Sequence, residues 1–432
     1  MDSTIEVNGK KRVVVIGGGF AGSSLISTLE RHLSDDWDIF LLSENNFVTF
    51  NPLLPEVIGA SLLPGHVLAP IRQMIKRTRI RMVHVDSIDF DKKEVHYHND
   101  EKGFIEYDHL VFAAGVRANT NITPGMQQHG LPLKTVGDAL YIRNKVIERL
   151  EQATIHTSEA RRKLLTTYVV VGGGFSGVEV AGELDDFLSS AQRYYKNVQR
   201  EDCRVIIVHG RDHLLPELSE SLGKSTEAIF RKRGIEVLLN TKVNAIENER
   251  VLLGNGEVIE ASTIICTVGT KPTAFSDDPR LNLTRGKIPT DEYMSVPSLP
   301  NVWALGDCAL VPNRHDNALS PPTAQFADRQ GKHLAKNIAL NVSGKPCVPF
   351  SYKPVGMLAS IGHNKAVAEI YGIKLSGFIA WLIWRGIYLM KMPTFSRKIR
   401  LFLEWNWAMF FPPDIAHLGF SRTKDDDKPE DA

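Results

Sequence analysis

The sequence predicts an α/β protein with two domains built on parallel β-sheets, followed by an amphipathic helical region near the C-terminal end. Two stretches, residues 13–32 and 168–184, each run from an apolar strand through a glycine-rich turn into a helix. Two later segments, 377–390 and 397–411, are apolar and hold four of the six tryptophans. At 432 residues the chain can bury two or three cores.

The first of these stretches begins Val13-Val-Val-Ile-Gly-Gly-Gly-Phe-Ala-Gly22. Three glycines at this spacing make a tight turn, let backbone N–H groups approach a pyrophosphate, and let the helix pack closely on the strand. The phosphates would lie at the positive end of the helix dipole. A plain strand–turn–helix connection is the alternative, but here all three elements are in register, which favours a Rossmann-like dinucleotide site. The expected contacts are Gly17, Gly19, Phe20, Ala21 and Gly22.

The second stretch repeats this pattern in Tyr168-Val-Val-Val-Gly-Gly-Gly-Phe-Ser-Gly177, with glycines Gly172, Gly174 and Gly177 in the corresponding places. Two dinucleotide sites in one chain imply two cofactors and electron transfer between them. The long helix that follows carries Glu179 and Glu183, which lie four residues apart on one face.

Composition and charge exclude several classes of protein. An apolar content of 43%, with 23% charged residues, is typical of a globular chain. A net charge of +1 argues against a nucleic-acid partner. The four cysteines are far apart in sequence, so their spacing predicts neither a metal site nor a dithiol redox pair. The N-terminal residues lack the apolar core of a signal peptide, and we expect the protein to stay on the cytoplasmic side.

Between the two turns, a strand at 37–42 ends in Ser43-Glu44. An acid about 20 residues after the third glycine is expected to bind a ribose, and Glu44 lies near that place; a surface glutamate is the alternative. Residues 66–76 have a helical pattern, and residues 235–260 read as an antiparallel meander.

Three further strands end in residues that suit a ligand. The strand at 107–115 ends in Ala114-Gly115, and the strand at 262–270, which includes Gly269, mirrors it. Small residues there let the backbone lie against a ligand, although a simple turn would need only the glycine. The third strand ends in Gly306-Asp307, where an aspartate is placed to bind a polyol such as the flavin ribitol.

The order of these motifs resembles the two-dinucleotide flavoprotein disulfide-reductase superfamily. Because no cysteine pair is present, the closer resemblance, over about residues 10–420, is to the type II NADH dehydrogenases. That resemblance also covers the loop Asn45–Leu54. It implies FAD and NADH or NADPH as cofactors, a membrane quinone as electron acceptor, a peripheral position on the cytoplasmic face of the cell membrane, and a homodimer as one option.

The resemblance also assigns roles to individual residues. Pro322-Thr-Ala-Gln-Phe-Ala-Asp-Arg-Gln330 resembles the family's quinone motif, in which Ala324 and Gln325 match. The second glutamine comes one place late, at Gln330, and a one-residue shift rotates a helical side chain by about 100°. Glu179 matches a family glutamate near the nicotinamide or the proton path; a carboxylate stabilised by the helix dipole is the alternative. Lys365 would serve the quinone site or lie in a surface loop.

The nucleotide preference departs from the family pattern. An NADH-preferring enzyme would end the strand at 205–208 with a glutamate that binds the ribose 2′-hydroxyl. Here the strand ends in His209-Gly-Arg211, and loss of the acid with gain of an arginine is the change that accommodates a 2′-phosphate. NADPH is therefore an open alternative to NADH, with His209 contacting the ribose in the latter case.

The segments at 377–390 and 397–411 combine apolar residues with arginine and lysine and are shorter than a membrane span of about 20 residues. This composition predicts helices that lie in the headgroup plane; a dimerisation or core-covering helix pair is the alternative. The expected order is an FAD-binding domain in two parts (1–120 and 291–372), an NAD(P)H-binding domain (121–290), a membrane-anchoring region (373–420) and a disordered acidic tail (421–432).

Three other functions share parts of this pattern. A sulfide:quinone oxidoreductase needs a redox cysteine pair that the sequence does not show. A soluble reductase of ferredoxin or rubredoxin would not need the tryptophan-rich C-terminal segments. A non-enzymatic flavin-binding redox sensor would keep both glycine turns and reduce quinones only very slowly.

Overall fold

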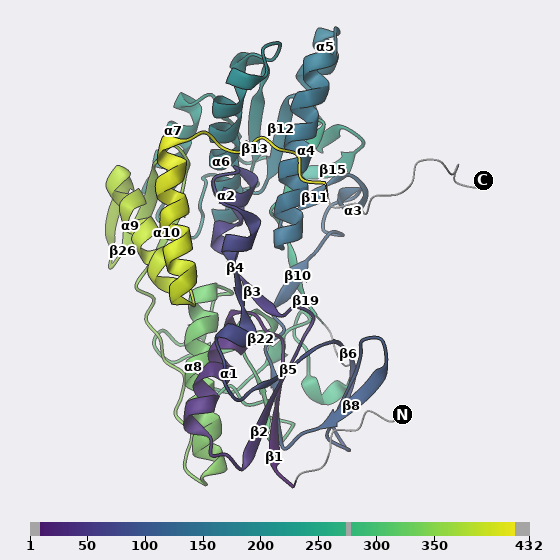
Figure 1. Cartoon of the computed structure of the whole chain (residues 1–432), viewed down its shortest axis with the longest axis vertical. Helices are drawn as coiled ribbons and strands as arrows, with labels where there is room; N and C mark the ends of the chain where they lie inside the picture. The colour runs from purple at the N-terminus through teal and green to yellow at the C-terminus, as the bar shows by residue number, and fades with distance from the viewer. Residues whose placement is uncertain (1–8, 274–277, 420–432) are drawn as a thin grey trace, which may run out of the picture.

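The structure is a computed structural model that describes residues 9–273 and 278–419. Its first sheet has the strand order β21-β9-β1-β2-β5, with every pair parallel. The strands are β1 (Lys11–Ile16), β2 (Trp37–Ser43), β5 (Arg79–Met82), β9 (His109–Phe112) and β21 (Val302–Ala304). β1 and β9 are almost wholly buried apolar runs, as expected of a parallel sheet covered on both faces. Helices α1 (Phe20–His32) and α8 (Ala324–Val342) lie side by side on it (Figure 1).

The second sheet repeats this plan in the other half of the molecule, in the order β11-β18-β12-β13-β14 and again parallel throughout. Its strands are β11 (Leu131–Pro132), β12 (Thr167–Val171), β13 (Arg204–Val208), β14 (Glu236–Leu238) and β18 (Thr263–Cys266). The helices of this half are α3 (Met126–His129), α4 (Val136–Ile155), α5 (Glu159–Leu165), α6 (Phe175–Ala191) and α7 (Glu220–Lys232). The predicted fold class, two Rossmann-like domains with a C-terminal helical region, is confirmed.

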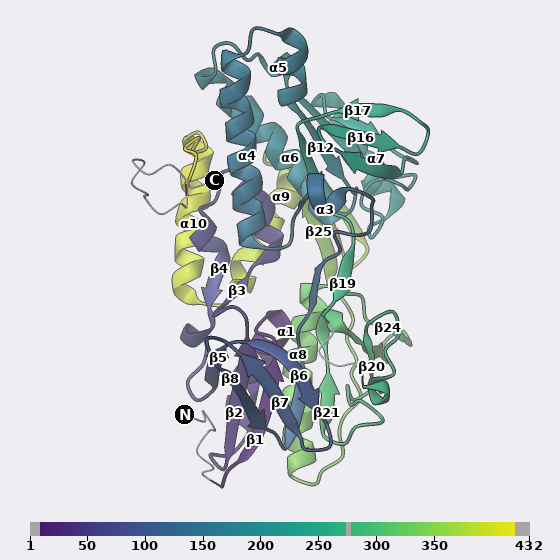
Figure 2. The ribbon, with the colours of Figure 1, turned by 90° about the vertical axis from the view of Figure 1, so that its right-hand side faces the viewer.

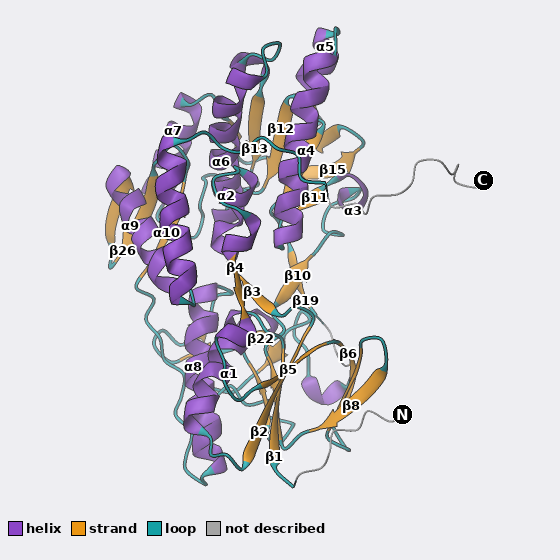
Figure 3. Cartoon of the chain, viewed as in Figure 1, coloured by secondary structure: helices purple, strands orange, loops and turns teal. Residues whose placement is uncertain are grey.

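The two halves are joined by a two-stranded antiparallel link, β10 (Val116–Ala118) with β19 (Thr270–Pro272), which lies between the sheets (Figure 2). Antiparallel sheets surround this frame (Figure 3). The three-stranded ones are β6 (His84–Asp89), β7 (Glu94–His98) and β8 (Lys102–Glu106); β15 (Val243–Glu247), β16 (Arg250–Leu253) and β17 (Val258–Glu260); and β25 (Gly356–Ser360), β26 (Ala366–Ile370) and β27 (Ile373–Gly377). The two-stranded ones pair β3 (Phe47–Thr49) with β4 (Leu68–Pro70) and β23 (Pro312–Asn313) with β24 (Ala318–Leu319); β20 (Ile288–Pro289) and β22 (Ala309–Leu310) form a short parallel pair.

Two local predictions were wrong. Residues 66–76 are not a helix but a 3₁₀ turn, strand β4 and a second 3₁₀ turn at Ile71–Gln73. Pro70 has no backbone N–H and disfavours helical backbone at the preceding residue, so a helix cannot run through it. The meander predicted for 235–260 begins only at β15, because β14 pairs in parallel with β13 and completes the second sheet.

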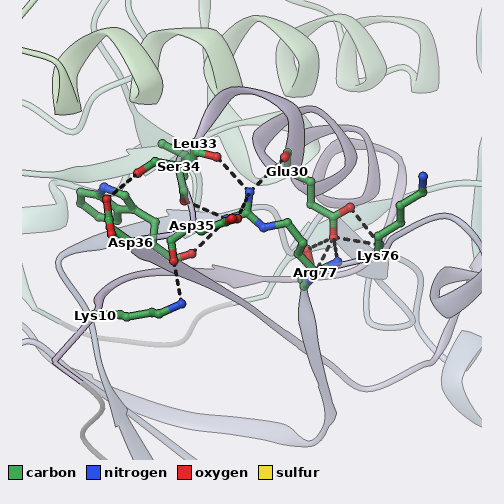
Figure 4. A network of polar contacts seen from close by, with 10 residues as sticks. Lys10, Glu30, Leu33, Ser34, Asp35, Asp36, Lys76 and Arg77 are labelled. Atoms are coloured by element: carbon green, nitrogen blue, oxygen red, sulfur yellow. Dashed lines mark hydrogen bonds and ion pairs between the residues drawn. The ribbon is translucent and has the colours of Figure 1, made fainter.

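The loop before β5 is fastened to the end of α1 by a polar network (Figure 4). The Glu30 carboxylate accepts hydrogen bonds from the backbone N–H groups of Lys76, Arg77 and Thr78 at 2.7–3.1 Å. The Arg77 guanidinium donates to the carbonyls of Leu33 and Ser34 at 2.9 and 2.8 Å. These contacts fix the outer strand of the first sheet.

The hydrophobic cores combine segments that lie far apart in the sequence. The core of the second half includes apolar side chains from the short helix α2 (Leu54–Ile58), although α2 lies between strands of the first half. The same core takes in Trp381 and Trp384 of α9 (Phe378–Lys391) and Trp405 of α10 (Phe395–Phe410). Helices α2, α4, α6, α9 and α10 are thus one packed group, whose outer surface on α9 and α10 remains apolar and exposed.

Among the described residues, no helix is both long enough and apolar enough to span a bilayer. The predicted acidic tail at 421–432 lies outside the residues that the structure describes.

The close contact of α8 with α1 gives a prediction about stability. An added Cβ on Gly331 of α8 would lie 2.5 Å from the carbonyl oxygen of Ala21, whereas an added Cβ on Gly386 of α9 would meet nothing within 4 Å. We expect Gly331→Ala to lower the free energy of unfolding by about 1–3 kcal/mol through overpacking. The matched variant Gly386→Ala should raise it by up to about 1 kcal/mol, because alanine is the better helix former. Denaturant unfolding measures both values, and equal effects of the two variants would contradict the packing described here.

Candidate functional site: two glycine turns and a buried carboxyl cluster

The first glycine turn connects β1 to α1 at the carboxyl edge of the first sheet. A Cβ added to Gly22 would overlap the carbonyl oxygen of Gly17, and one added to Gly17 would overlap that of Ala113. Gly17 also has a backbone φ of +105°, which residues other than glycine rarely adopt. By contrast, a Cβ on Gly19 would meet nothing within 4 Å, so the backbone there is open to a ligand.

The start of α1 is suited to an anion. Gly19 is the N-cap, no side chain caps the first turn, and no acidic residue lies in it. The first backbone N–H groups of the helix are therefore available to phosphate oxygens. This cradle fits the pyrophosphate of FAD, with Phe20 and Ala21 in the same first turn.

The second turn has the same construction. A Cβ on Gly177 would overlap the carbonyl oxygen of Gly172, which has φ of +116°. Gly174 is the N-cap of α6, again with no side-chain cap and no acid in the first turn. The two predicted dinucleotide turns thus have matching backbone geometry, each at the carboxyl edge of a parallel sheet, but at the second turn the Glu217 carboxylate lies 3.3 Å from the Cβ position of Gly174.

The third predicted ligand segment, Gly306-Asp307, follows β21 beside the end of β9. The Gly306 N–H donates to Oε1 of Gln330 at 2.8 Å, and the Gln330 side chain is buried. Burial raises the pKa of Asp307, against the opposing charges of Lys134 and Lys287. The late glutamine of the expected quinone motif therefore holds the backbone on which Asp307 sits.

Other sequence-predicted residues have different surroundings. Gln325 lies in the first turn of α8, next to Ala324, and donates to the Tyr352 hydroxyl. Lys365 lies instead in the turn between β25 and β26, where its N–H donates to Gly362 O at 3.0 Å. Gly115 and Gly269, which follow β9 and β18, both have positive φ, as expected of strand exits that must turn sharply.

Glu44, the predicted ribose ligand, is half-exposed and already paired in this structure. Its carboxylate accepts from Arg117 and lies 2.9 Å from Nδ1 of His84. Ser43, the residue before it, lies against the first turn, because a Cβ added to Gly18 would lie 2.8 Å from its Oγ.

His209, at the end of β13, contacts the second turn directly. The Gly173 N–H donates to its Nδ1 at 3.1 Å. The neighbouring Arg211 is exposed. The structure thus brings His209 against the turn and leaves Arg211 exposed to solvent next to it.

A cluster of buried carboxyl groups joins α6 to α2 and the C-terminal helices. Glu179 accepts from the Ser360 N–H at 3.1 Å, Glu183 from the Ser61 hydroxyl at 3.3 Å, and Glu56 from the Trp405 indole N–H at 2.9 Å. Burial raises the pKa of Glu179 to about 8 and that of Glu56 to about 7, and it raises the pKa of Glu183 well above its usual range.

One cation faces this cluster from α9. Burial lowers the pKa of Arg385, while the charges of Glu56 and Glu183 raise it. The guanidinium carbon lies 3.9 Å from the centre of the Trp381 ring. The charge of Arg233 also acts on Glu183, but the three glutamates outnumber these two arginines, so part of the cluster stays protonated near neutral pH. A cavity of about 580 Å³ adjoins it, with Glu56, Glu183, Asp186, Arg385, Arg400 and Trp407 in its wall.

Sequence reasoning missed Glu56. The i,i+4 spacing of Glu179 and Glu183 was a visible signal, but Glu56 lies in a proline-rich stretch whose packing against α6 has no local pattern.

A chain of aromatic rings runs from the first turn to the C-terminal helices. The ring centres of Phe20 and Phe50 are 5.6 Å apart, and those of Phe50 and Tyr388 on α9 are 5.9 Å apart. Tyr388 in turn lies 4.7 Å from Trp384. Burial raises the pKa of Tyr388, and the charge of Glu179 raises it further, which places the carboxyl cluster beside this chain.

The cysteines do not form a redox pair in the described part of the chain. All four are free, and Cys203, Cys266 and Cys308 are buried. Burial raises the pKa of the Cys308 thiol to about 11, so it is not a thiolate at neutral pH. A disulfide- or sulfide-dependent reaction has no support in these residues.

Comparison with known proteins identifies the family. The model of the pyridine nucleotide-disulphide oxidoreductases matches residues 11–331. The chain belongs to this family. A second model, the NDH2 C-terminal domain, matches residues 355–412, which include α9 and α10.

Relatives of this chain match almost its whole length. A probable NADH dehydrogenase of Dictyostelium discoideum is 29% identical over 94% of this chain and 91% of its own. The type II NADH:quinone oxidoreductase Ndh of Mycobacterium tuberculosis is 29% identical over 92% and 87%. The solved structure of NDH2 from Plasmodium falciparum in complex with NADH has the same fold, with a TM-score of 0.87 at 21% identity over 94% of this chain and all of that one.

The carboxyl cluster gives a prediction about the pH dependence of stability. Between about pH 4.5 and about pH 7, folded Glu56 keeps a proton that the unfolded chain has released. The free energy of unfolding should therefore fall as pH rises through this window. We expect Glu56→Gln, which stays neutral and still accepts from Trp405, to lose less stability than the parent protein between about pH 5 and about pH 8.

Thermal unfolding across this pH range measures the effect. Glu101→Gln, at an exposed position, is the matched control and should follow the parent protein. Identical pH slopes for the parent and Glu56→Gln would show that Glu56 ionises normally in the folded state.

Proposed function

We propose that this protein is an FAD-dependent oxidoreductase that takes a hydride from a nicotinamide nucleotide and reduces a membrane quinone without pumping protons. The observation that carries the proposal is the connection between the first turn and the C-terminal helices. Phe20 of the first turn contacts Phe50, and Phe50 contacts Tyr388 of α9, whose helix has an exposed apolar face. A lipid-soluble substrate that enters between these helices would thus reach the region of the flavin. The names of the relatives with NADH and quinone activity support the same reaction.

The chain's own residues supply binding and position. When bound, FAD supplies the two-electron chemistry that links hydride acceptance to quinone reduction. The turn at Gly17–Gly22 would hold its pyrophosphate and Asp307 its ribitol, with Gln330 fixing the Gly306 backbone. The turn at Gly172–Gly177 would hold the nicotinamide nucleotide. Gln325 and Ala324, at the start of α8, would border the quinone, and Lys365 is the further residue that we assign to the quinone site.

The overall reaction consumes one proton from solvent: nucleotide hydride, one proton and quinone give oxidised nucleotide and quinol. Glu179 is the group we assign to hold that proton. Its carboxyl is buried in the nicotinamide-side helix, keeps its proton up to about pH 8, and lies in the cluster that adjoins the cavity. Hydrogen bonding to Ser360 N–H fixes its position.

We also place the protein at a membrane surface, on the cytoplasmic face. The exposed side of α9 and α10 carries large apolar side chains that a soluble surface rarely gathers. They are Phe378, Ile379, Leu382, Phe395, Phe402, Leu403, Trp407 and Phe410. Arg397, Lys398 and Arg400 at the start of α10 suit anionic headgroups.

The role of Glu179 predicts a pH profile. Since the proton is present below about pH 8 and absent above it, turnover with a quinone analogue should fall as pH rises through about 8. Glu179→Gln should lose about 10²–10⁴-fold in quinone reduction and abolish that limb of the profile. The exposed control Glu260→Gln should keep both the rate and the profile. A Glu179→Gln variant with the parent's rate and pH limb would remove Glu179 from the proton path.

The membrane assignment predicts binding to vesicles. The parent protein should sediment with vesicles that contain phosphatidylglycerol. The double variant Trp407→Ser, Phe410→Ser should bind them about tenfold or more weakly, because burial of each ring contributes ~1.5–3 kcal/mol to binding. Tyr141→Ser, at an exposed site on α4, is the control. If the patch is instead a dimer contact, the parent will be a dimer without vesicles and the double variant a monomer.

The reaction itself is tested by steady-state oxidation of the nucleotide by the FAD-loaded protein with ubiquinone and menaquinone analogues. We expect fast quinone-dependent oxidation and slow oxidation with ferredoxin or rubredoxin. Transfer to ferredoxin or rubredoxin alone would identify a soluble reductase, and no transfer to any acceptor would identify a flavin-binding sensor.

A further inference from the structure

The residue at the end of β13 decides which nucleotide the second site can bind. In Rossmann sites that bind NAD, an acid at this strand end accepts hydrogen bonds from the ribose hydroxyls. Here the strand ends at Val208 and His209 follows, with Gly210 and Arg211 next.

Contact with the turn fixes the tautomer of His209. The Gly173 N–H donates to Nδ1 at 3.1 Å, and a Cβ on Gly173 would lie only 2.6 Å from the imidazole Cγ. Burial lowers the pKa of His209, and the charge of Arg211 lowers it further, so the ring is neutral. A neutral ring whose Nδ1 accepts must carry its proton on Nε2.

Nε2 is therefore a donor, and no residue among 9–273 and 278–419 accepts from it. The atom is buried and makes no hydrogen bond within the described part of the chain. A buried donor without a partner costs free energy, which a ligand oxygen at this place would recover.

The surrounding charges favour an anion. Arg211 lies close enough to affect His209, and the side chain of Lys242 lies 3.6 Å from the Cβ position of Gly210. The loop is held by the Asn240 N–H and Thr241 N–H, which donate to Arg211 O and His209 O at 2.8 and 2.9 Å.

Neither Arg211 nor Lys242 takes part in any of the ion pairs found among residues 9–273 and 278–419. The nearby acids have other places: Asp212 pairs with His213, and Glu217 lies beside Gly174 at the start of α6.

We propose that this site binds a nicotinamide nucleotide that carries a 2′-phosphate, with the His209 Nε2–H and the Arg211 guanidinium as its phosphate ligands and Lys242 as a further positive charge. The proposal rests on the proposed function for the nicotinamide half of the nucleotide, but the adenosine half is recognised here and can be measured alone. NADPH is the nucleotide of this class.

The different hydrogen-bonding groups of a strand-end carboxylate and of His209 with Arg211 explain the preference for a 2′-phosphate. A strand-end carboxylate only accepts hydrogen bonds, so it binds ribose hydroxyls and repels a phosphate. His209 offers only a donor, and an arginine fork matches phosphate oxygens in two parallel hydrogen bonds. The 2′-phosphate gains both contacts, whereas a 2′-hydroxyl can accept only one of them.

The test is equilibrium binding to the full-length, FAD-loaded protein by calorimetry, with adenosine 2′,5′-bisphosphate and ADP as probes. We expect the bisphosphate to bind at least tenfold more tightly than ADP. The ratio of the two affinities should become smaller at high salt. Arg211→Gln should lower bisphosphate affinity about tenfold and leave ADP affinity unchanged. The control Arg250→Gln, whose partner is Glu247 on the outer meander, should change neither.

His209→Glu supplies the opposite test, because it restores the strand-end acid. It should weaken binding of the bisphosphate by more than tenfold and shift kcat/KM from NADPH towards NADH. His209→Gln, which stays neutral and can still donate a hydrogen bond, should keep part of the preference. It also shows whether a failure of His209→Glu is a folding defect. Equal binding of the two probes, or tighter binding of ADP, would overturn the proposal.

The outcomes separate this proposal from the proposed function. A bisphosphate preference without quinone reduction would leave the nucleotide assignment in place and remove the reaction. Quinone reduction with NADH, together with equal probe affinities, would remove only the 2′-phosphate assignment.

Discussion

The structure depends on the space between the first and third glycines of its two turns. In each turn the carbonyl oxygen of the first glycine lies where any side chain on the third would have to be, at Gly17 and Gly22 and again at Gly172 and Gly177. This contact sets how closely the helix lies on its sheet. It also leaves the first N–H groups of α1 and α6 without side-chain caps, which makes two anion sites from backbone alone.

A second constraint, charge burial, ties the two halves to the C-terminal helices. Glu56 comes from α2, and Glu179 and Glu183 come from α6. Their respective partners, Trp405, Ser360 and Ser61, belong to other parts of the chain. Carboxyl groups in such a place stay protonated unless a cation is near, and Arg385 and Arg233 are the cations whose charges act on them. The same packing that anchors α10 therefore creates groups that exchange protons near neutral pH.

The sequence predicted what depends on local pattern. The two turns, the strand ends at Gly115, Gly269 and Asp307, and the C-terminal helices each have a signal within a few residues, and the fold class follows from them. It did not predict what depends on long-range packing. The position of α2 in the second core, and thus the role of Glu56, cannot be read from a proline-rich stretch. Residues 66–76 have helical spacing, but pairing of β4 with β3 and Pro70 prevent a helix there.

The same distinction between local pattern and long-range packing applies to the roles of individual side chains. Gln330 was predicted from a motif shifted by one residue, and only the structure shows its bond to the Gly306 backbone. His209 was recognised as a substitution in sequence, but its tautomer depends on the distance to Gly173 N–H. Glu44 was placed from an average spacing, and its pairing with Arg117 and His84 depends on two other elements.

Rapid double mixing tests most directly whether one chain passes two electrons from a nicotinamide nucleotide through a flavin to a quinone. The FAD-loaded protein would be mixed without oxygen with NADPH or NADH, and then with a ubiquinone or menaquinone analogue, while flavin absorbance is followed. We expect rapid bleaching by the nucleotide and rapid return of the oxidised spectrum on addition of the quinone. Bleaching that persists in quinone and reverses only with ferredoxin or oxygen would contradict it, as would the absence of any bleaching.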